Sequence, residues 1–176
     1  MLVEPRDPFR VMYLRDLIQI GTKIAAPDII DVGPIVYNLG AGKQELPWVH
    51  TKLDLPDWDG ERDAIPAFAV SVDTIFAIHF LEHLSVAGVV RVLREAERVL
   101  QPGGTFNIVV PHAISKLAYE DLDHRTRFCE DTWRNLFRTN YYDKHSQDPW
   151  RFRVGANFIF GHKIDNLCLF TQLVRE

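Results

Sequence analysis

The spacing of apolar residues along the chain predicts strands that alternate with helices. Three short apolar runs, at residues 35–39, 72–80 and 105–110, have the length and composition of buried strands. A further strand is expected over residues 49–55. Between the last two runs, apolar side chains recur at helical spacing from residue 85 to residue 100, opposite arginines and glutamates, which predicts an amphipathic helix. A Pro-Gly-Gly run at 102–104 is expected to end that helix.

The two ends of the chain carry other patterns. Residues 9–25 have apolar side chains at near-helical spacing, which predicts an N-terminal helix. Residues 113–140 predict short helical pieces interrupted by a loop near 122–128. Alternation of apolar and polar residues over 150–160 and 167–174 predicts a hairpin. This order of elements predicts one α/β domain with a doubly wound, mostly parallel sheet and a C-terminal antiparallel hairpin.

Composition narrows the classes of function. The 176 residues fit one domain, and 47% hydrophobic with 25% charged residues is ordinary for a globular protein. The net charge of −4 offers no basic excess for a phosphate backbone, which disfavours nucleic acid as the main substrate. Two cysteines form no disulfide framework, so we expect reduced thiols in a cytoplasmic protein. No apolar run is long enough to span a membrane, and acid and proline near the N-terminus argue against a secretory signal.

A glycine loop, Asn38-Leu39-Gly40-Ala41-Gly42, follows the first expected strand. Glycines at such a turn let the backbone come within contact distance of a ligand, and in an open α/β sheet the turn faces the ligand crevice. A Gly-x-Gly pair also serves ordinary turns, so the loop alone leaves both interpretations open.

Neighbouring residues separate three classes of ligand for this loop. Tyr37 and Gln44 stand where a mononucleotide P-loop needs glycine and a hydroxyl residue, which excludes a P-loop. Glu45 stands where a dinucleotide site needs a third glycine, and its carboxylate would repel the pyrophosphate, which disfavours an NAD-dependent oxidoreductase. A nucleoside ligand without phosphate is compatible. Asp54, at the end of the second strand, can accept hydrogen bonds from both ribose hydroxyls; the alternative is a turn aspartate before Pro56.

Four segments in order resemble the class I S-adenosylmethionine-dependent methyltransferases, in particular the small methyltransferase type 11 domains. The segments are residues 36–42, 48–55, 72–84 and 92–104. The third contains a His-x-Leu-Glu-His run, and the fourth ends in Arg-Val-Leu-Gln-Pro-Gly-Gly, with glutamine in place of the family's lysine. The resemblance implies a Rossmann-like fold, S-adenosylmethionine as cofactor and methyl transfer as activity. The connection at 43–48 is shorter than the family's, so the usual first helix must be reduced to about a turn, and the stretch at 63–68 is also shorter than the family's.

The resemblance also implies where the cofactor binds. Gly40 and Gly42 would line its methionine part, Asp54 would hold the ribose, Asp63 would lie near the adenine, and His79 would lie beside the cofactor. The predicted cofactor-binding residues are Asn38, Gly40, Ala41, Gly42, Asp54, Leu55, Asp63, Ala64 and His79. The single domain, 1–176, then comprises an N-terminal helix in 1–30, a cofactor-binding core in 35–111, and an acceptor side with the hairpin in 112–176.

A metal site is the competing interpretation of the segment from His79 to His83. It satisfies His-x-x-Glu-His, the inverted signature of zinc proteases, in which two histidines on one helix face bind zinc and Glu82 would act as base. His79 ends a strand-like run, however, and the helix is expected to begin only near Ser85. The two histidines would then share no helix face, so we predict no metal.

Candidate catalytic residues follow from the chemistry of methyl transfer. An in-line displacement on an activated methyl group needs alignment of the acceptor and exclusion of water rather than a fixed triad. A hydroxyl acceptor also needs a base, for which His79 and His124 are the candidates, with His112 as a third. The alternative for each is an exposed loop histidine. Arg125 and Arg127 either bind an acidic acceptor group or pair with neighbouring carboxylates.

Two classes of function remain open. The first is a methyltransferase acting on a small-molecule acceptor or on a sugar- or lipid-linked one. The second is a catalytically inactive, methyltransferase-like module for binding or regulation. Intact cofactor motifs favour the first. Little of the chain lies outside the sheet layers, so we expect an open acceptor site, a modest acceptor, or a pocket completed by a second subunit in a homodimer.

Overall fold

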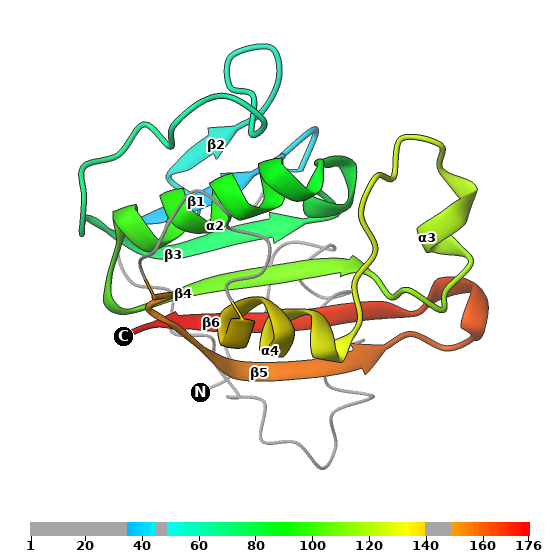
Figure 1. The fold of residues 1–176 in the computed structure, drawn as a ribbon. Helices are drawn as coiled ribbons and strands as arrows, with labels where there is room; N and C mark the ends of the chain where they lie inside the picture. The colour runs from blue at the N-terminus through cyan, green and yellow to red at the C-terminus, as the bar shows by residue number, and fades with distance from the viewer. Residues whose placement is uncertain (1–34, 45–48, 140–148) are drawn as a thin grey trace, which may run out of the picture.

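The computed structural model describes residues 35–44, 49–139 and 149–176, and in them a six-stranded sheet of order β2-β1-β3-β4-β6-β5 (Figure 1). The strands are β1 (Val36–Leu39), β2 (Thr51–Leu53), β3 (Val72–Ile78), β4 (Leu100–Pro111), β5 (Phe152–Phe160) and β6 (Cys168–Arg175). The first four run parallel, and β6 is antiparallel to both β4 and β5. The mostly parallel, Rossmann-like sheet with an antiparallel C-terminal pair is therefore confirmed. The expected N-terminal helix and Glu45 lie outside the described residues.

The helical elements follow the expected order, and one of them is long. They are η1 (Leu81–His83), α2 (Val86–Val99), α3 (Leu117–Glu120), α4 (Glu130–Thr139) and η2 (Ile164–Asn166). Ser85 caps α2, because its hydroxyl accepts a hydrogen bond from the Gly88 amide at 3.1 Å. None of the helices in the described ranges is long and apolar enough to cross a membrane.

Two details of α2 differ from the sequence-based expectation. Strand β4 begins at Leu100, directly after the helix, so the Pro-Gly-Gly run belongs to the strand and not to a separate turn. Val86, an apolar residue in the first turn of the expected helix, is 48% exposed, because the contacts of α2 with the sheet begin only at Val89. The buried residues of α2 are Gly88, Val89, Val90, Val92, Leu93, Ala96, Glu97 and Val99, and they include a charged residue, Glu97.

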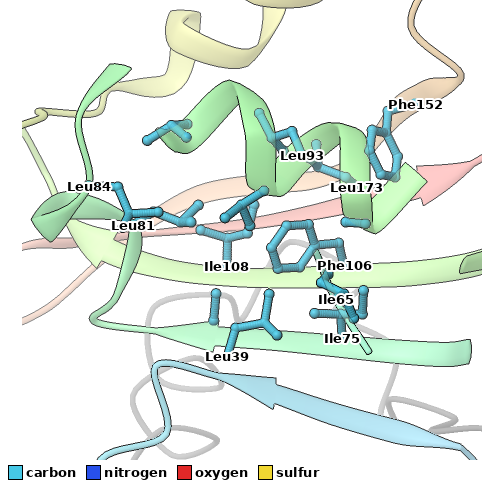
Figure 2. Packing of buried hydrophobic residues seen from close by; sticks show 14 of the residues in the cluster. Leu39, Ile65, Ile75, Leu81, Leu84, Leu93, Phe106, Ile108, Phe152 and Leu173 are labelled. Carbon is cyan, nitrogen blue, oxygen red and sulfur yellow. The ribbon is translucent and has the colours of Figure 1, made fainter. Parts of the chain in front are cut away.

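The two faces of the sheet carry separate clusters of buried side chains. Alternate residues of β3 divide between them: Ile75 and Ala77 belong to the cluster under α2 and α4, whereas Phe76 and Ile78 belong to the other. In the first cluster, Leu93 of α2 lies over side chains of the strands (Figure 2). This packing fixes the register of β3 and hence the position of the residues that follow it.

The edge at which β1, β2 and β3 end collects the predicted site residues. Parallel strands bring their carboxyl ends together, and the order of the sheet reverses between β1 and β3. Open α/β sheets bind ligands in the crevice at such a switch point. The residues that follow these three strands are Gly40 after β1, Asp54 after β2 and His79 after β3.

Candidate cofactor site and the adjoining histidine cluster

The glycine loop and Asp54 hold each other in place. Asp54 accepts hydrogen bonds from the Gly42 amide at 2.5 Å through Oδ2 and from its neighbour Leu55 at 2.8 Å through Oδ1. The Gly40 amide donates to the carbonyl of Leu53 at 2.8 Å, which joins the loop to the end of β2. Gly42 has a φ of 50°, a left-handed conformation that glycine adopts without strain. The carboxylate is thus oriented by the backbone, and each oxygen keeps a lone pair for another donor.

A cavity of about 410 Å³ opens beside this carboxylate. Six of the nine predicted cofactor-binding residues line it: Ala41, Gly42, Asp54, Leu55, Asp63 and Ala64. The sequence analysis did not identify the rest of the lining, which is Lys52, Leu53, Asp57, Trp58 and Pro66. Residues 57–58 come three and four positions after Asp54, and their closeness to it in sequence was the available signal.

Three of the predicted residues do not line the cavity. Asn38 is fully buried, and its side-chain amide donates to Gln44 at 3.2 Å. Gly40, at a φ of 62°, faces Phe80, so that a Cβ on Gly40 would lie only 2.6 Å from the Cβ of Phe80. The Phe80 ring continues toward Trp58, with ring centroids 5.7 Å apart. Gly40 therefore makes room for an aromatic side chain between the loop and Trp58. His79, the third residue, directly follows β3 and is not among the lining residues.

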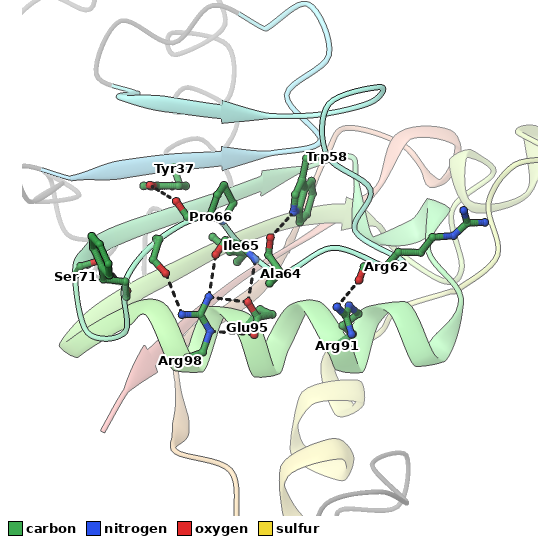
Figure 3. A network of polar contacts seen from close by, with 12 residues as sticks. Tyr37, Trp58, Arg62, Ala64, Ile65, Pro66, Ser71, Arg91, Glu95 and Arg98 are labelled. Carbon is green, nitrogen blue, oxygen red and sulfur yellow. Dashed lines mark hydrogen bonds and ion pairs between the residues drawn. The ribbon is translucent and has the colours of Figure 1, made fainter.

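A network of ionic and backbone contacts holds the far wall of the cavity against α2 (Figure 3). Arg98 donates to the carbonyl of Ala67 at 2.9 Å and to that of Ile65 at 2.8 Å. Glu95 accepts from the Ile65 amide at 2.9 Å and pairs with Arg98 at 2.8 Å. Burial opposes the charge on Glu95, but the hydrogen bonds from Arg98 and the Ile65 amide, together with the charges of Arg98 and Arg91, outweigh it, and the pKa of this carboxyl lies below its ordinary value. Trp58 also stabilises this wall, because its indole N–H donates a hydrogen bond to the carbonyl of Ala64 at 3.1 Å.

The charges around the cavity fit a cofactor without phosphate. Asp54, Asp57 and Asp63 line it together with one cation, Lys52. Three carboxylates would repel a pyrophosphate, but they suit hydroxyl and amino donors and a positively charged sulfonium. The residues present therefore fit S-adenosylmethionine.

His79 follows β3 in a strained conformation and is tied to two side chains. Its φ of 53° is rare for a residue with a side chain, although histidine tolerates it better than most. Its Nδ1 lies 3.2 Å from Oε1 of Glu82. Burial disfavours the imidazolium, but hydrogen bonds with Cys168 and Glu82 raise the pKa of His79 to about 10. With that pKa the ring is protonated at neutral pH, which weighs against the hypothesis that it acts as a base.

The other candidate histidines are not exposed loop residues, contrary to the alternative considered from sequence. His112 is 4% exposed, and its Nε2 lies 2.9 Å from Oε2 of Glu130. That contact lowers the pKa of Glu130. The side chain of His124 is 9% exposed and packs edge-on against His83, with ring centroids 4.8 Å apart. Long-range contacts bury both rings, and local sequence does not reveal such contacts.

The two arginines that follow His124 contact residues other than the expected carboxylates. Arg125 lies 3.5 Å from Glu61, which also accepts hydrogen bonds from Ser85. The guanidinium of Arg127 lies 4.4 Å above the ring of Tyr119. Arg125 is therefore part of the connection between the cavity wall and the start of α2.

Comparison with protein families identifies the class of protein in which this edge of the sheet occurs. The sequence profile described as "Methyltransferase domain" matches residues 22–108, a span that includes the glycine loop, Asp54 and His79. This match, over 87 of the 176 residues, identifies a methyltransferase domain in the chain. Its cofactor is S-adenosylmethionine, in agreement with the acidic lining of the cavity, which disfavours a ligand that carries phosphate groups.

Solved structures show the same fold at low sequence identity. A S-adenosylmethionine-dependent methyltransferase from Mesorhizobium loti is 16% identical, with a TM-score of 0.60 over 84% of this chain and 94% of that one. A candidate methyltransferase of Haloferax volcanii, in complex with the Trm112 methyltransferase activator, is 14% identical, with a TM-score of 0.59 over 94% and 92%. A 16S rRNA (adenine(1408)-N(1))-methyltransferase from Catenulisporales acidiphilia is 14% identical, with a TM-score of 0.55 over 82% and 86%. No curated protein sequence matches this methyltransferase.

Proposed function

We propose that this methyltransferase binds S-adenosylmethionine in the cavity beside Asp54 and transfers its methyl group to a small-molecule acceptor or to a sugar- or lipid-linked one. The observation that carries the proposal is the Asp54 carboxylate, fixed by two backbone amides at the rim of the cavity. In the proposed arrangement Asp54 accepts from the ribose hydroxyls, and the adenine lies beside Asp63 and Ala64. Gly42 and Ala41 face the amino-acid part of the cofactor.

The contribution of the chain to the reaction is alignment. Bound S-adenosylmethionine supplies a methyl group that is already activated by its sulfonium. The residues of the glycine loop and the Arg98-anchored wall hold the cofactor rigidly, and the acceptor then needs to approach in line with the carbon–sulfur bond. The roles of His79 and His124 as general bases remain predictions, and a base is needed only if the acceptor is a hydroxyl.

Charge supports an acceptor that is not a nucleic acid. RNA acceptors do occur on this fold, as the rRNA methyltransferase above shows. Binding a phosphate backbone requires several basic side chains directed outward. The net charge here is −4, and near the site Arg125, Arg98 and Arg91 are engaged with Glu61, Glu95 and the carbonyl of Arg62. A compact acceptor fits this surface better.

Calorimetric titration with S-adenosylmethionine and S-adenosylhomocysteine tests the cofactor half of the proposal. Asp54→Ala should weaken binding by about 1.5–3 kcal/mol, the scale of hydrogen bonds to a charged group. Asp73→Ala is the matched control, because Asp73 also accepts a backbone amide hydrogen bond, from Ile35 at 2.8 Å, but lies at the opposite edge of the sheet. Equal affinities for Asp54→Ala and wild type would refute the assignment.

Turnover tests the other half. Incubation with candidate hydroxyl, amine and glycolipid acceptors should yield S-adenosylhomocysteine in amounts matched by methylated acceptor, measured by mass spectrometry. Methylation of RNA in place of these acceptors would contradict the proposed class. Binding of the cofactor without any turnover would instead support the inactive binding module.

A further inference from the structure

A cluster of Glu82, His83 and His124 lies next to the cofactor edge, and the function proposed above assigns no role to Glu82 or His83. One ligand-type atom from each of the three residues lies within 4.8 Å of the other two. Glu82 and His83 belong to η1, whereas His124 comes from the loop before α4, about forty residues later in the chain. Ligands from two separate segments that meet in space are typical of metal sites in folded proteins.

Two atoms of the cluster lack partners in a way that needs an explanation. Glu82 is 1% exposed, and its Oε2 has no hydrogen-bond partner among the described residues. Nδ1 of His124 is likewise buried without a partner in the described part of the chain. A buried carboxylate oxygen that makes no hydrogen bond carries a large desolvation cost, and native structures rarely leave one uncompensated. A cation between these two atoms would compensate both.

The other polar atoms of Glu82 and His124 lie near neighbouring side chains. Oε1 of Glu82 contacts Nδ1 of His79 at 3.2 Å, which leaves Oε2 for the cluster. Nε2 of His124 lies 3.9 Å from Oδ2 of Asp121, an ion-pair distance but not a hydrogen bond, and Nδ1 is the nitrogen that has no partner among the described residues. A carboxylate behind a ligating histidine fixes its ring orientation and strengthens its basicity, and this arrangement is common around bound metals.

The backbone holds the two segments of the cluster together. The amides of Arg125 and Thr126 both donate to the carbonyl of Glu82, at 2.7 and 3.1 Å. The hydroxyl of Thr126 donates to the carbonyl of Leu81 at 3.0 Å. His124 is therefore carried by a loop that is fastened to the turn bearing Glu82 and His83, so small rotations of the side chains suffice to close three ligand atoms around one ion.

We propose that Glu82, His83 and His124 form a binding site for a divalent transition-metal ion of the zinc type. Two imidazole nitrogens and one carboxylate favour zinc or cobalt over magnesium, which prefers oxygen ligands. The sequence argument against a metal concerned only His79 and His83 on one helix; in the structure the second histidine is His124, and no shared helix face is needed. Three protein ligands leave one coordination position of the metal open, and an oxygen of the acceptor is suited to occupy it. This last step rests on the proposed function.

Metal analysis of the purified full chain tests this site. The protein is stripped with a chelator, dialysed, titrated with Zn²⁺ or Co²⁺ alone, and its metal content is measured by mass spectrometry. We expect one equivalent of Zn²⁺ per chain and an intense visible absorption band for Co²⁺, which reports nitrogen ligands in a low-coordinate site. Glu82→Gln and His124→Asn should each weaken binding by at least about tenfold.

His50→Asn is the matched control, because His50 is an exposed histidine at the amino ends of β1 and β2, the opposite edge of the sheet. It should bind zinc like the wild type. Absence of stoichiometric Zn²⁺ and of the Co²⁺ band in the wild type would overturn the inference, as would unchanged binding by folded His124→Asn. Titration of the chelator-treated wild type with S-adenosylhomocysteine separates the two proposals: cofactor binding without metal binding refutes the metal site alone.

Discussion

Replacing Gly40 with alanine tests how the loop, Phe80 and Trp58 fit together. The new Cβ would lie 2.6 Å from the Cβ of Phe80 and closer still to its ring, a separation that real side chains do not show. The clash involves the base of the Phe80 side chain, so a change of rotamer does not relieve it and the backbone must move. Gly40 also has a φ of 62°, a conformation that costs a residue with a side chain about 1–2 kcal/mol.

The two contributions give the expected magnitude. Overpacking of a well-packed site costs about 1–3 kcal/mol. Added to the backbone strain, this predicts that Gly40→Ala lowers the free energy of unfolding by about 2–5 kcal/mol. Gly103→Ala is the control, because Gly103 has a φ of 82° and an added Cβ there would have no other atom within 4 Å, so that only the strain of about 1–2 kcal/mol applies.

Urea denaturation, followed by circular dichroism and by tryptophan fluorescence, measures both variants against the wild type. The difference between the two losses isolates the contact with Phe80. If Gly40→Ala is no more destabilised than Gly103→Ala, then Phe80 does not occupy the space in front of the glycine loop and the described packing is wrong.

Three further changes test the elements around the site. Ser85→Ala removes the N-cap of α2 and should cost about 1 kcal/mol in thermal unfolding; an unchanged melting temperature would contradict the capping role. Trp133→Ala, which removes a fully buried ring stacked on Phe128, should cost about 3–5 kcal/mol in urea denaturation, and a loss below about 1 kcal/mol would show that the ring is not core. Glu95 has a lowered folded-state pKa, so its stabilisation is present above its ordinary pKa of 4.5 and is lost as the pH falls through the lower folded value. The stability gap between wild type and Glu95→Gln should therefore be largest near about pH 7 and narrow toward about pH 3, and a gap that widens in acid would refute the role of Arg98.

The strands and the glycine loop could be predicted because their signals are local. Short apolar runs such as residues 72–80 favour buried strands, and a glycine pair directly after a strand favours a tight turn there. Asp54 could be placed at the cavity because it ends a strand that pairs in parallel with β1, and parallel strands end at the same edge. These features depend on residues close together in sequence.

The parts that sequence missed depend on contacts between distant segments. His124 meets Glu82 and His83 only because a loop before α4 hydrogen-bonds to η1. His112 is buried because Glu130, eighteen positions later, reaches its ring. No periodicity or spacing along the chain predicts contacts between such distant segments. From sequence, the alternative for both histidines was therefore an exposed loop position, and the only metal motif considered was His79 to His83 on one helix.

The position of the cofactor is the central claim, and a crystal structure with S-adenosylhomocysteine tests it most directly. The account predicts the ribose hydroxyls within hydrogen-bond distance of the Asp54 carboxylate and the adenine beside Asp63 and Ala64, in the cavity of about 410 Å³. A nucleoside bound elsewhere on the chain, or a ribose that does not contact Asp54, would contradict it.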